Sequence, residues 1–235
     1  MGNHRTGCLI CGQALQYFEA PRKLTCEKCG LEFEAGACCE NNHYVCDRCH
    51  SRAGFEAISE SALAAGSADP VQVAREMMEN GFINMHGPEH HYLVVAALLA
   101  AYKNAGGRVD LEKVLPLARQ RAEKVPGGIC GLWGSCGAGI GSGIFISLVT
   151  GASPLSGREW SLANQMTSRS LASIAENGGP RCCKRDTYLA ILAAVDFVRE
   201  HLGVKMTRPE TVRCSFYMNN PSCRKEACLF YPAEA

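Results

Sequence analysis

The 15 cysteines of this chain, many of them in close pairs, constrain its fold more than any other feature. Eight lie within residues 1–52, residues 53–129 contain none, and seven lie within residues 130–235. Secreted domains held by disulfides are usually shorter, and they follow a signal peptide, whereas the first residues here contain no apolar stretch of that kind. We therefore expect metal-binding cysteines in a reducing compartment, and a cytoplasmic location.

Charge and hydropathy argue against two kinds of partner, nucleic acid and the membrane. The formal net charge is +1, which gives no electrostatic reason to expect binding to nucleic acid. The longest apolar segment, residues 140–149, is too short and too rich in glycine to span a bilayer. We expect neither a nucleic-acid partner nor a membrane.

The first cysteine motif consists of two pairs with two residues between the partners. Cys8 and Cys11 form the first pair, Cys26 and Cys29 the second, and fourteen residues separate the pairs. Such a spacing lets both sulfurs of a pair reach one ion, and two pairs complete a tetrahedron. The motif predicts one structural zinc ion held by all four residues, with rubredoxin-like iron as the alternative.

A second motif follows between residues 38 and 50, where Cys46 and Cys49 form another such pair. The spacing predicts a second zinc ion with four protein ligands, and therefore a structural role. Short runs typical of strands favour a zinc-ribbon-type module of hairpins over residues 1–52, able to bind a protein partner. The predicted ligands of the second ion are Cys39, His43, Cys46 and Cys49, with Cys38 and His50 as alternates.

From about residue 69 onward the apolar residues recur with helical spacing. Ser156 and Glu159 form a predicted capping box at the start of one helix. The pattern predicts a mainly α fold: a helical bundle-like domain over residues 53–206, followed by a cysteine-containing tail over residues 207–235. Five or six helices are predicted, in the segments 69–81, 91–105, 110–125, 140–149, 156–178 and 183–202.

Three chemically reactive segments of the helical domain each precede an apolar helix. They are residues 86–91, 127–143 and 178–186. A helix N-terminus offers free N–H groups and positive potential, which stabilise thiolates and bound anions. We interpret the glycines around Cys130 and Cys136 as positions where the backbone approaches a bulky group.

If the three segments converge, their cysteines can hold an iron–sulfur cluster. The prediction is a [4Fe–4S] cluster bound by Cys130, Cys136 and one of Cys182 and Cys183. The fourth iron would be open to substrate, or bound by a histidine of the first segment. A redox disulfide, within either pair of cysteines, is the alternative.

The remaining polar residues of these segments are assigned to chemistry. Histidine or carboxylate side chains can act as base or metal ligand, and cationic side chains can hold an anionic small molecule or a sulfur donor or acceptor. The predicted catalytic residues are His86, Glu89, His90 and Cys183, and the predicted substrate-binding residues are Arg181, Lys184 and Arg185.

The tail carries Cys214, Cys223 and Cys228. Their spacing is similar to that of the first three ligands of a CCCH zinc finger, but the closing histidine is missing. A fourth ligand must come from elsewhere in the chain, or the three cysteines join the central site.

Four segments together carry a family resemblance: the ribbon, MHGPEHH, CGxWGxCGAGxGxGIF and GGPRCCKRD. Over nearly its whole length the chain resembles a family of uncharacterised prokaryotic proteins, domain of unknown function 5714. The resemblance implies prokaryotic, often anaerobic hosts, and no established activity. The segment from Pro180 to Arg185 also resembles part of the iron–sulfur serine dehydratases and cysteine desulfidases, as an analogy of mechanism.

These observations favour a cluster-dependent enzyme of sulfur or small-molecule chemistry, such as an iron–sulfur lyase, a desulfidase or a sulfurtransferase. Two alternatives remain open. One is a redox-sensing or adaptor protein that docks a partner through its ribbon. The other is a sulfur or metal carrier that uses Cys182 and Cys183.

Overall fold

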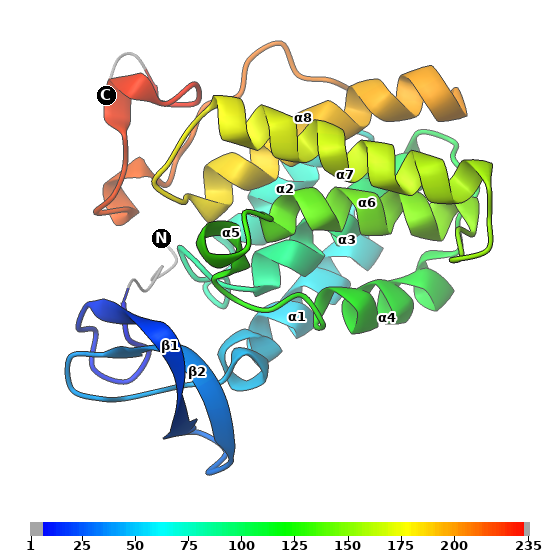
Figure 1. Cartoon of the computed structure of the whole chain (residues 1–235). Coiled ribbons are helices and arrows are strands. Elements are labelled where there is room, and N and C mark those ends of the chain that lie inside the picture. Colours follow the sequence, from blue (N-terminus) through cyan, green and yellow to red (C-terminus); the bar gives the residue numbers. More distant parts are fainter. Residues whose placement is uncertain (1–6, 233–235) are drawn as a thin grey trace.

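The computed structural model describes residues 7–232, and within them it shows a hairpin followed by eight α-helices (Figure 1). The hairpin and the helices form two regions joined through the first helix. The elements are β1 (Leu15–Thr25), β2 (Glu32–Cys39), α1 (Asp47–Ala64), α2 (Pro70–Glu79), α3 (Glu89–Asn104), α4 (Leu111–Ala122), α5 (Ile129–Leu132), α6 (Gly137–Thr150), α7 (Arg158–Glu176) and α8 (Cys183–Leu202). The mainly α fold with a small N-terminal hairpin confirms the predicted fold class.

Helix α3 is the centre of the helical region. Every residue from Tyr92 to Ala101 has no exposed surface, because the helix packs against α1, α2, α4, α6 and α8. In Figure 1 it runs through the middle of the bundle. A helix that is apolar on all sides is stable in water only in such a position.

Glycines of α6 allow this helix to lie very close to its neighbours. A side chain at Gly137 or Gly141 would overlap His91 on α3, and one at Gly139 or Gly143 would overlap α7. The interpretation of these four glycines as a backbone approach to a bulky ligand is therefore wrong. They serve helix packing, as small residues spaced by four do on one helix face.

Two elements differ from the sequence-based expectation. Helix α1 was not predicted, although Phe55, Ile58 and Ala62 form its buried face. The boundary expected at residue 52 lies within this helix. The capping box is wrong: α7 begins after Gly157, and the Ser156 hydroxyl accepts from the backbone N–H of Ser153 instead.

The tail folds back onto the helical region. Val212, Phe216 and Phe230 are buried, and the backbone N–H of Cys214 donates to the carbonyl of Phe230. This brings the end of the described chain near the N-terminal end of α8.

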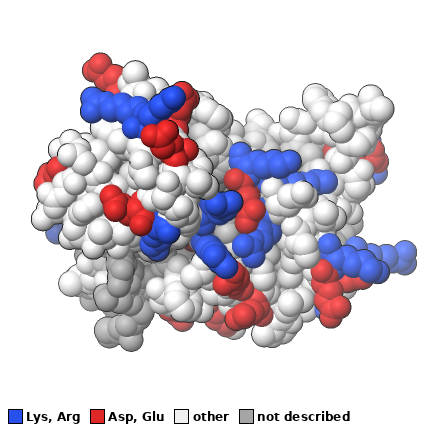
Figure 2. Space-filling view, turned by 90° about the horizontal axis from the view of Figure 1, so that it is seen from below, with Lys and Arg blue, Asp and Glu red and all other residues white. Residues whose placement is uncertain are grey.

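The exposed charges are mixed. On the face shown in Figure 2, Lys and Arg side chains lie next to Asp and Glu side chains, without an extended area of one sign. Within residues 7–232, no helix combines the length and hydrophobicity that a bilayer crossing requires.

Candidate metal centres and central pocket

The first candidate metal centre lies at the open end of the hairpin. Its four ligand atoms all lie within 4.8 Å of one another, and they belong to Cys8, Cys11, Cys39 and His43. The Cys11 and Cys39 sulfurs are 3.8 Å apart, and the Cys8 sulfur is 4.0 Å from His43 Nδ1. Sulfurs around one tetrahedral zinc ion are also about 3.8 Å apart, since each Zn–S bond is about 2.3 Å long.

The second candidate centre joins the hairpin to α1. It consists of Cys26, Cys29, Cys46 and Cys49, whose sulfurs also lie within 4.8 Å of one another. Burial raises the pKa of Cys26, but backbone N–H groups of Cys46 and Cys29 donate to its sulfur, so that the pKa falls to about 6 overall. Both centres therefore have the donor set and the spacing to hold a metal ion.

The pairing of the first four cysteines differs from the prediction. Cys8 and Cys11 do not share a site with Cys26 and Cys29, because the first pair precedes β1 and the second follows it. Eleven extended residues separate the pairs by up to roughly 35 Å. Antiparallel pairing instead places Cys39 opposite Leu15, beside the first pair.

The alternates of the second motif lie outside both centres. The Cys38 thiol lies 3.8 Å from the side-chain oxygen of Asn42. His50 Nδ1 lies 3.6 Å from Glu89 Oε2, at ion-pair distance.

Glu89 connects the metal module to the bundle. It is fully buried, and its Oε1 accepts from both the backbone N–H and the side chain of Asn84, at 3.0 and 3.1 Å. Burial raises its pKa, but the neighbouring His50 and His90 outweigh this and lower it to about 2. The ionised carboxylate of Glu89 on α3 thus contacts His50 in the first turn of α1 and Asn84 in the loop before α3.

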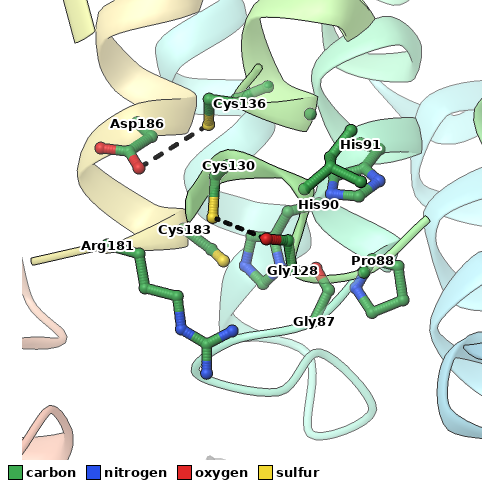
Figure 3. Close-up of a pocket in the computed structure, with 14 residues that line it drawn as sticks. Gly87, Pro88, His90, His91, Gly128, Cys130, Cys136, Arg181, Cys183 and Asp186 are labelled. Atoms are coloured by element: carbon green, nitrogen blue, oxygen red, sulfur yellow. Dashed lines mark hydrogen bonds between the residues drawn. The ribbon is translucent and has the colours of Figure 1, made fainter. Parts of the chain in front are cut away.

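A cavity of about 60 Å³ lies where the three predicted reactive segments meet (Figure 3). The segments before α3, α6 and α8 each contribute to its wall. Among its lining residues are His90, Cys130, Cys136, Arg181, Cys183 and Asp186. We refer to this cavity as the central pocket.

His90 presents an unpaired nitrogen in this region. Its Nδ1 lies 3.1 Å from the Gly87 carbonyl, which fixes the proton on Nδ1. Burial, and then the charge of Lys184, hold its pKa well below the usual range, so that the ring is neutral. Its Nε2 is buried without a hydrogen-bond partner among the described residues and carries a free lone pair.

Cys136 faces an acidic neighbour that the sequence analysis did not single out. Its thiol lies 3.8 Å from Asp186 Oδ2, as Figure 3 shows. Burial, reinforced by this carboxyl group, raises the pKa of Cys136 to about 12. Asp186 directly follows Arg185, the last of the predicted substrate-binding cations. A carboxylate this close to Cys182 and Cys183 in the sequence could have identified it as a site residue.

The three predicted substrate-binding cations occupy different environments. Arg181 lines the central pocket. Arg185 donates to Asp186 at 3.1 Å and to the Pro180 carbonyl at 2.9 Å. Lys184 is fully buried, and burial lowers its pKa to about 8. Arg181 is thus the cation placed to meet a ligand in the pocket.

His86 and Cys182 lie apart from the central pocket. Cys182 lines a separate cavity together with the three tail cysteines. His86 Nε2 lies 3.4 Å from Asn220 Oδ1, and Asn220 donates to the Cys182 sulfur. Of the two adjacent cysteines, the structure therefore brings Cys183 to Cys130 and Cys136.

Comparison with known proteins adds a family and no activity. A family model described as a family of unknown function, DUF5714, matches residues 58–231, which is more than half of the chain. Searches of curated proteins and of solved structures find no match. The analogy with iron–sulfur serine dehydratases and cysteine desulfidases is not supported.

Proposed function

Because the chain belongs to this family of unknown function, we propose a function from its own residues: it is a metalloprotein with a reaction pocket built on an iron–sulfur cluster. Cys130, Cys136 and Cys183 bind the cluster. The two N-terminal centres bind zinc in a structural role.

One observation carries the proposal: three cysteines from two segments far apart in the sequence, Cys130 and Cys136 from one and Cys183 from the other, line one pocket. Their sulfurs are too widely spaced for one ion, since no group of three ligand atoms here lies within 4.8 Å, in contrast to the two N-terminal centres. A [4Fe–4S] cluster fits wider spacing, because each thiolate binds its own iron.

The remaining pocket residues suit a small anionic ligand at the fourth iron. Arg181 supplies positive charge, and the free lone pair of His90 Nε2 can accept a hydrogen bond from a bound molecule. The cluster would supply Lewis-acid or one-electron chemistry. The sulfur or small-molecule chemistry expected from the sequence is compatible with such a pocket.

Zinc suits the two N-terminal centres for a different reason. Each offers four protein ligands at tetrahedral spacing and leaves no position open for a substrate. A partner protein that docks on this module remains a prediction.

The test is anaerobic purification followed by analysis of iron, sulfide and zinc. We expect two zinc ions per chain, and iron that falls by about four per chain in the Cys130→Ser, Cys136→Ser variant. Cys38→Ser is the matched control, because Cys38 is a buried cysteine outside both centres. Iron that the double variant retains in full would refute the proposal. Zinc without iron, together with a Cys130–Cys136 disulfide after mild oxidation, would favour a thiol switch.

A further inference from the structure

The sequence showed no fourth ligand for the three tail cysteines, and the structure places a cysteine beside them at the start of α8. Cys182 directly precedes this helix, and Cys214, Cys223 and Cys228 return to it from the folded tail. All four line one cavity. We refer to it as the tail cavity.

Three of the four sulfurs accept hydrogen bonds from nitrogen. Phe216 N–H donates to Cys214 at 3.3 Å, and the Asn220 amide donates to Cys182 at 3.6 Å. Such N–H···S contacts stabilise thiolates and tune the potentials of the clusters that they bind.

The loop that carries Cys223 contains a strained backbone residue whose N–H donates to the Cys223 sulfur. Lys225 has a φ of +50°, which residues other than glycine rarely adopt. Its backbone N–H donates to the Cys223 sulfur at 3.4 Å. Backbone strain of this kind persists where the surroundings impose it. Here the strained residue aims its N–H at a potential ligand.

The spacing of the four sulfurs argues against a single bound ion. No three of them lie within 4.8 Å of one another, according to the geometry of the described residues, whereas both N-terminal centres meet this limit. A single zinc ion therefore fits the N-terminal centres and not the tail cavity.

Aromatic rings line the tail cavity. Tyr188 packs edge-on against Phe230 with ring centres 5.4 Å apart, and Tyr217 packs against Tyr231 at 5.1 Å. An apolar shell protects a cluster from solvent and sets its potential.

Lys184, in the first turn of α8, borders the tail cavity. It has no exposed surface, and its Nζ has no hydrogen-bond partner within residues 7–232. The nitrogen lies 4.8 Å from the centre of the Phe216 ring, which lines the cavity.

We infer that Cys182, Cys214, Cys223 and Cys228 bind a [4Fe–4S] cluster, separate from the one proposed for the central pocket. This site does not depend on the central one. With every iron bound to a cysteine, it offers no position for a substrate and is suited to hold or pass single electrons.

The test compares two double variants of the full chain, purified anaerobically. Cys214→Ser, Cys228→Ser should lose about four irons and four sulfides and keep both zinc ions. Cys130→Ser, Cys136→Ser should keep these four irons, so that failure of the central site leaves this inference standing. Cys38→Ser again serves as the control. The inference is overturned if the tail variant keeps all its iron, or if it loses a third zinc ion instead.

A milder variant keeps the inference testable if the tail variant does not fold. Asn220→Ala removes the N–H···S bond to Cys182 and retains all four thiols. We expect its iron content to be unchanged, and the midpoint potential of one cluster to fall in a redox titration followed by electron paramagnetic resonance. Potentials identical to those of the wild type would contradict a cluster at Cys182.

Discussion

Cys182 and Cys183 are consecutive residues, yet they line two different cavities. Cys182 occupies the N-cap of α8 and faces the tail, whereas Cys183 begins the helix and faces the central pocket. Cys182 has an extended backbone and Cys183 is the first helical residue, so that their side chains point in different directions. One step along the chain therefore separates the two proposed clusters.

This division predicts opposite effects for two neighbouring substitutions. Cys183→Ser should remove the central cluster and spare the tail cluster, and Cys182→Ser should do the reverse. Iron analysis and electron paramagnetic resonance of the reduced proteins would check this. If both substitutions removed the same spectroscopic signal, both cysteines would serve one cluster.

His90 should act on the ligand in the pocket rather than hold the cluster. We expect His90→Gln to retain the full iron content, because three thiolates suffice to bind the central cluster. Iron analysis of this variant beside Cys183→Ser provides the comparison. Loss of iron from His90→Gln would make His90 the fourth ligand.

The close approach of α6 to α3 predicts a cost for one added methyl group. A Cβ at Gly141 would lie 2.6 Å from the His91 carbonyl, which the helix backbone holds in place. We expect Gly141→Ala to lower the free energy of unfolding by about 1–3 kcal/mol, or the Tm by about 2–4 °C per kcal/mol.

Gly66→Ala is the matched control for this substitution, because nothing lies within 4 Å of a Cβ at Gly66. Thermal unfolding of both variants measures the difference. Equal Tm values would show that α6 can move away from α3 without cost.

Glu89 should contribute to stability through its charge. Glu89→Ala leaves the buried donors of Asn84 without an acceptor and should cost about 2–3 kcal/mol. Glu89→Gln should cost less, since an amide oxygen can still accept from Asn84. Denaturant unfolding of both variants tests the order.

The pKa of Glu89 sets the pH range of this effect. The folded value of about 2 lies below the ordinary value of 4.5, so the contribution is complete above about pH 4.5 and is lost as the pH falls toward 2. The difference in unfolding free energy between wild type and Glu89→Gln should therefore shrink only as the pH falls from about 4.5 toward 2. A difference that already shrinks as the pH falls from about 8 to 6 would mean that Glu89 titrates near neutrality, as a catalytic carboxyl group can.

The two N-terminal centres should differ in their effect on the bundle. Cys49 lies in the first turn of α1, whose Phe55 and Ile58 are part of the core, whereas Cys11 belongs to the hairpin alone. Cys11→Ser and Cys49→Ser should each lose one zinc ion. Only Cys49→Ser should lower the Tm of the helical region by several degrees, as near-ultraviolet circular dichroism would report. Equal shifts would place the hairpin within the same cooperative unit.

Local signals in the sequence predicted some elements well. Helix α8 (Cys183–Leu202) matches the predicted segment 183–202 and ends at Gly203, which has a φ of +70°. Helix α4, capped by the Asp110 side chain, lies within the predicted segment 110–125. Helix α1 was missed because its first residues, from Asp47 onward, overlap a cysteine motif that was read only as metal ligands.

Long-range arrangement could not be read in the same way. Spacing alone cannot show that the antiparallel register carries Cys39 to Cys11, nor that the tail returns to Cys182. The meaning of Gly139 likewise depends on which helix packs against it. In each case the deciding contact is made by residues distant in the sequence.

The interleaving of the two N-terminal centres also has a consequence for the order of assembly during synthesis. In the sequence, Cys26 and Cys29 lie between the first and the last ligand of the first centre, Cys8 and His43. Their own centre is completed only by Cys46 and Cys49. Neither centre can complete its set of four ligands until nearly the whole module has left the ribosome. The last ligands of the two centres then emerge within a few residues of each other, together with the first turn of α1, so that completion of both candidate centres coincides with the start of the helical core.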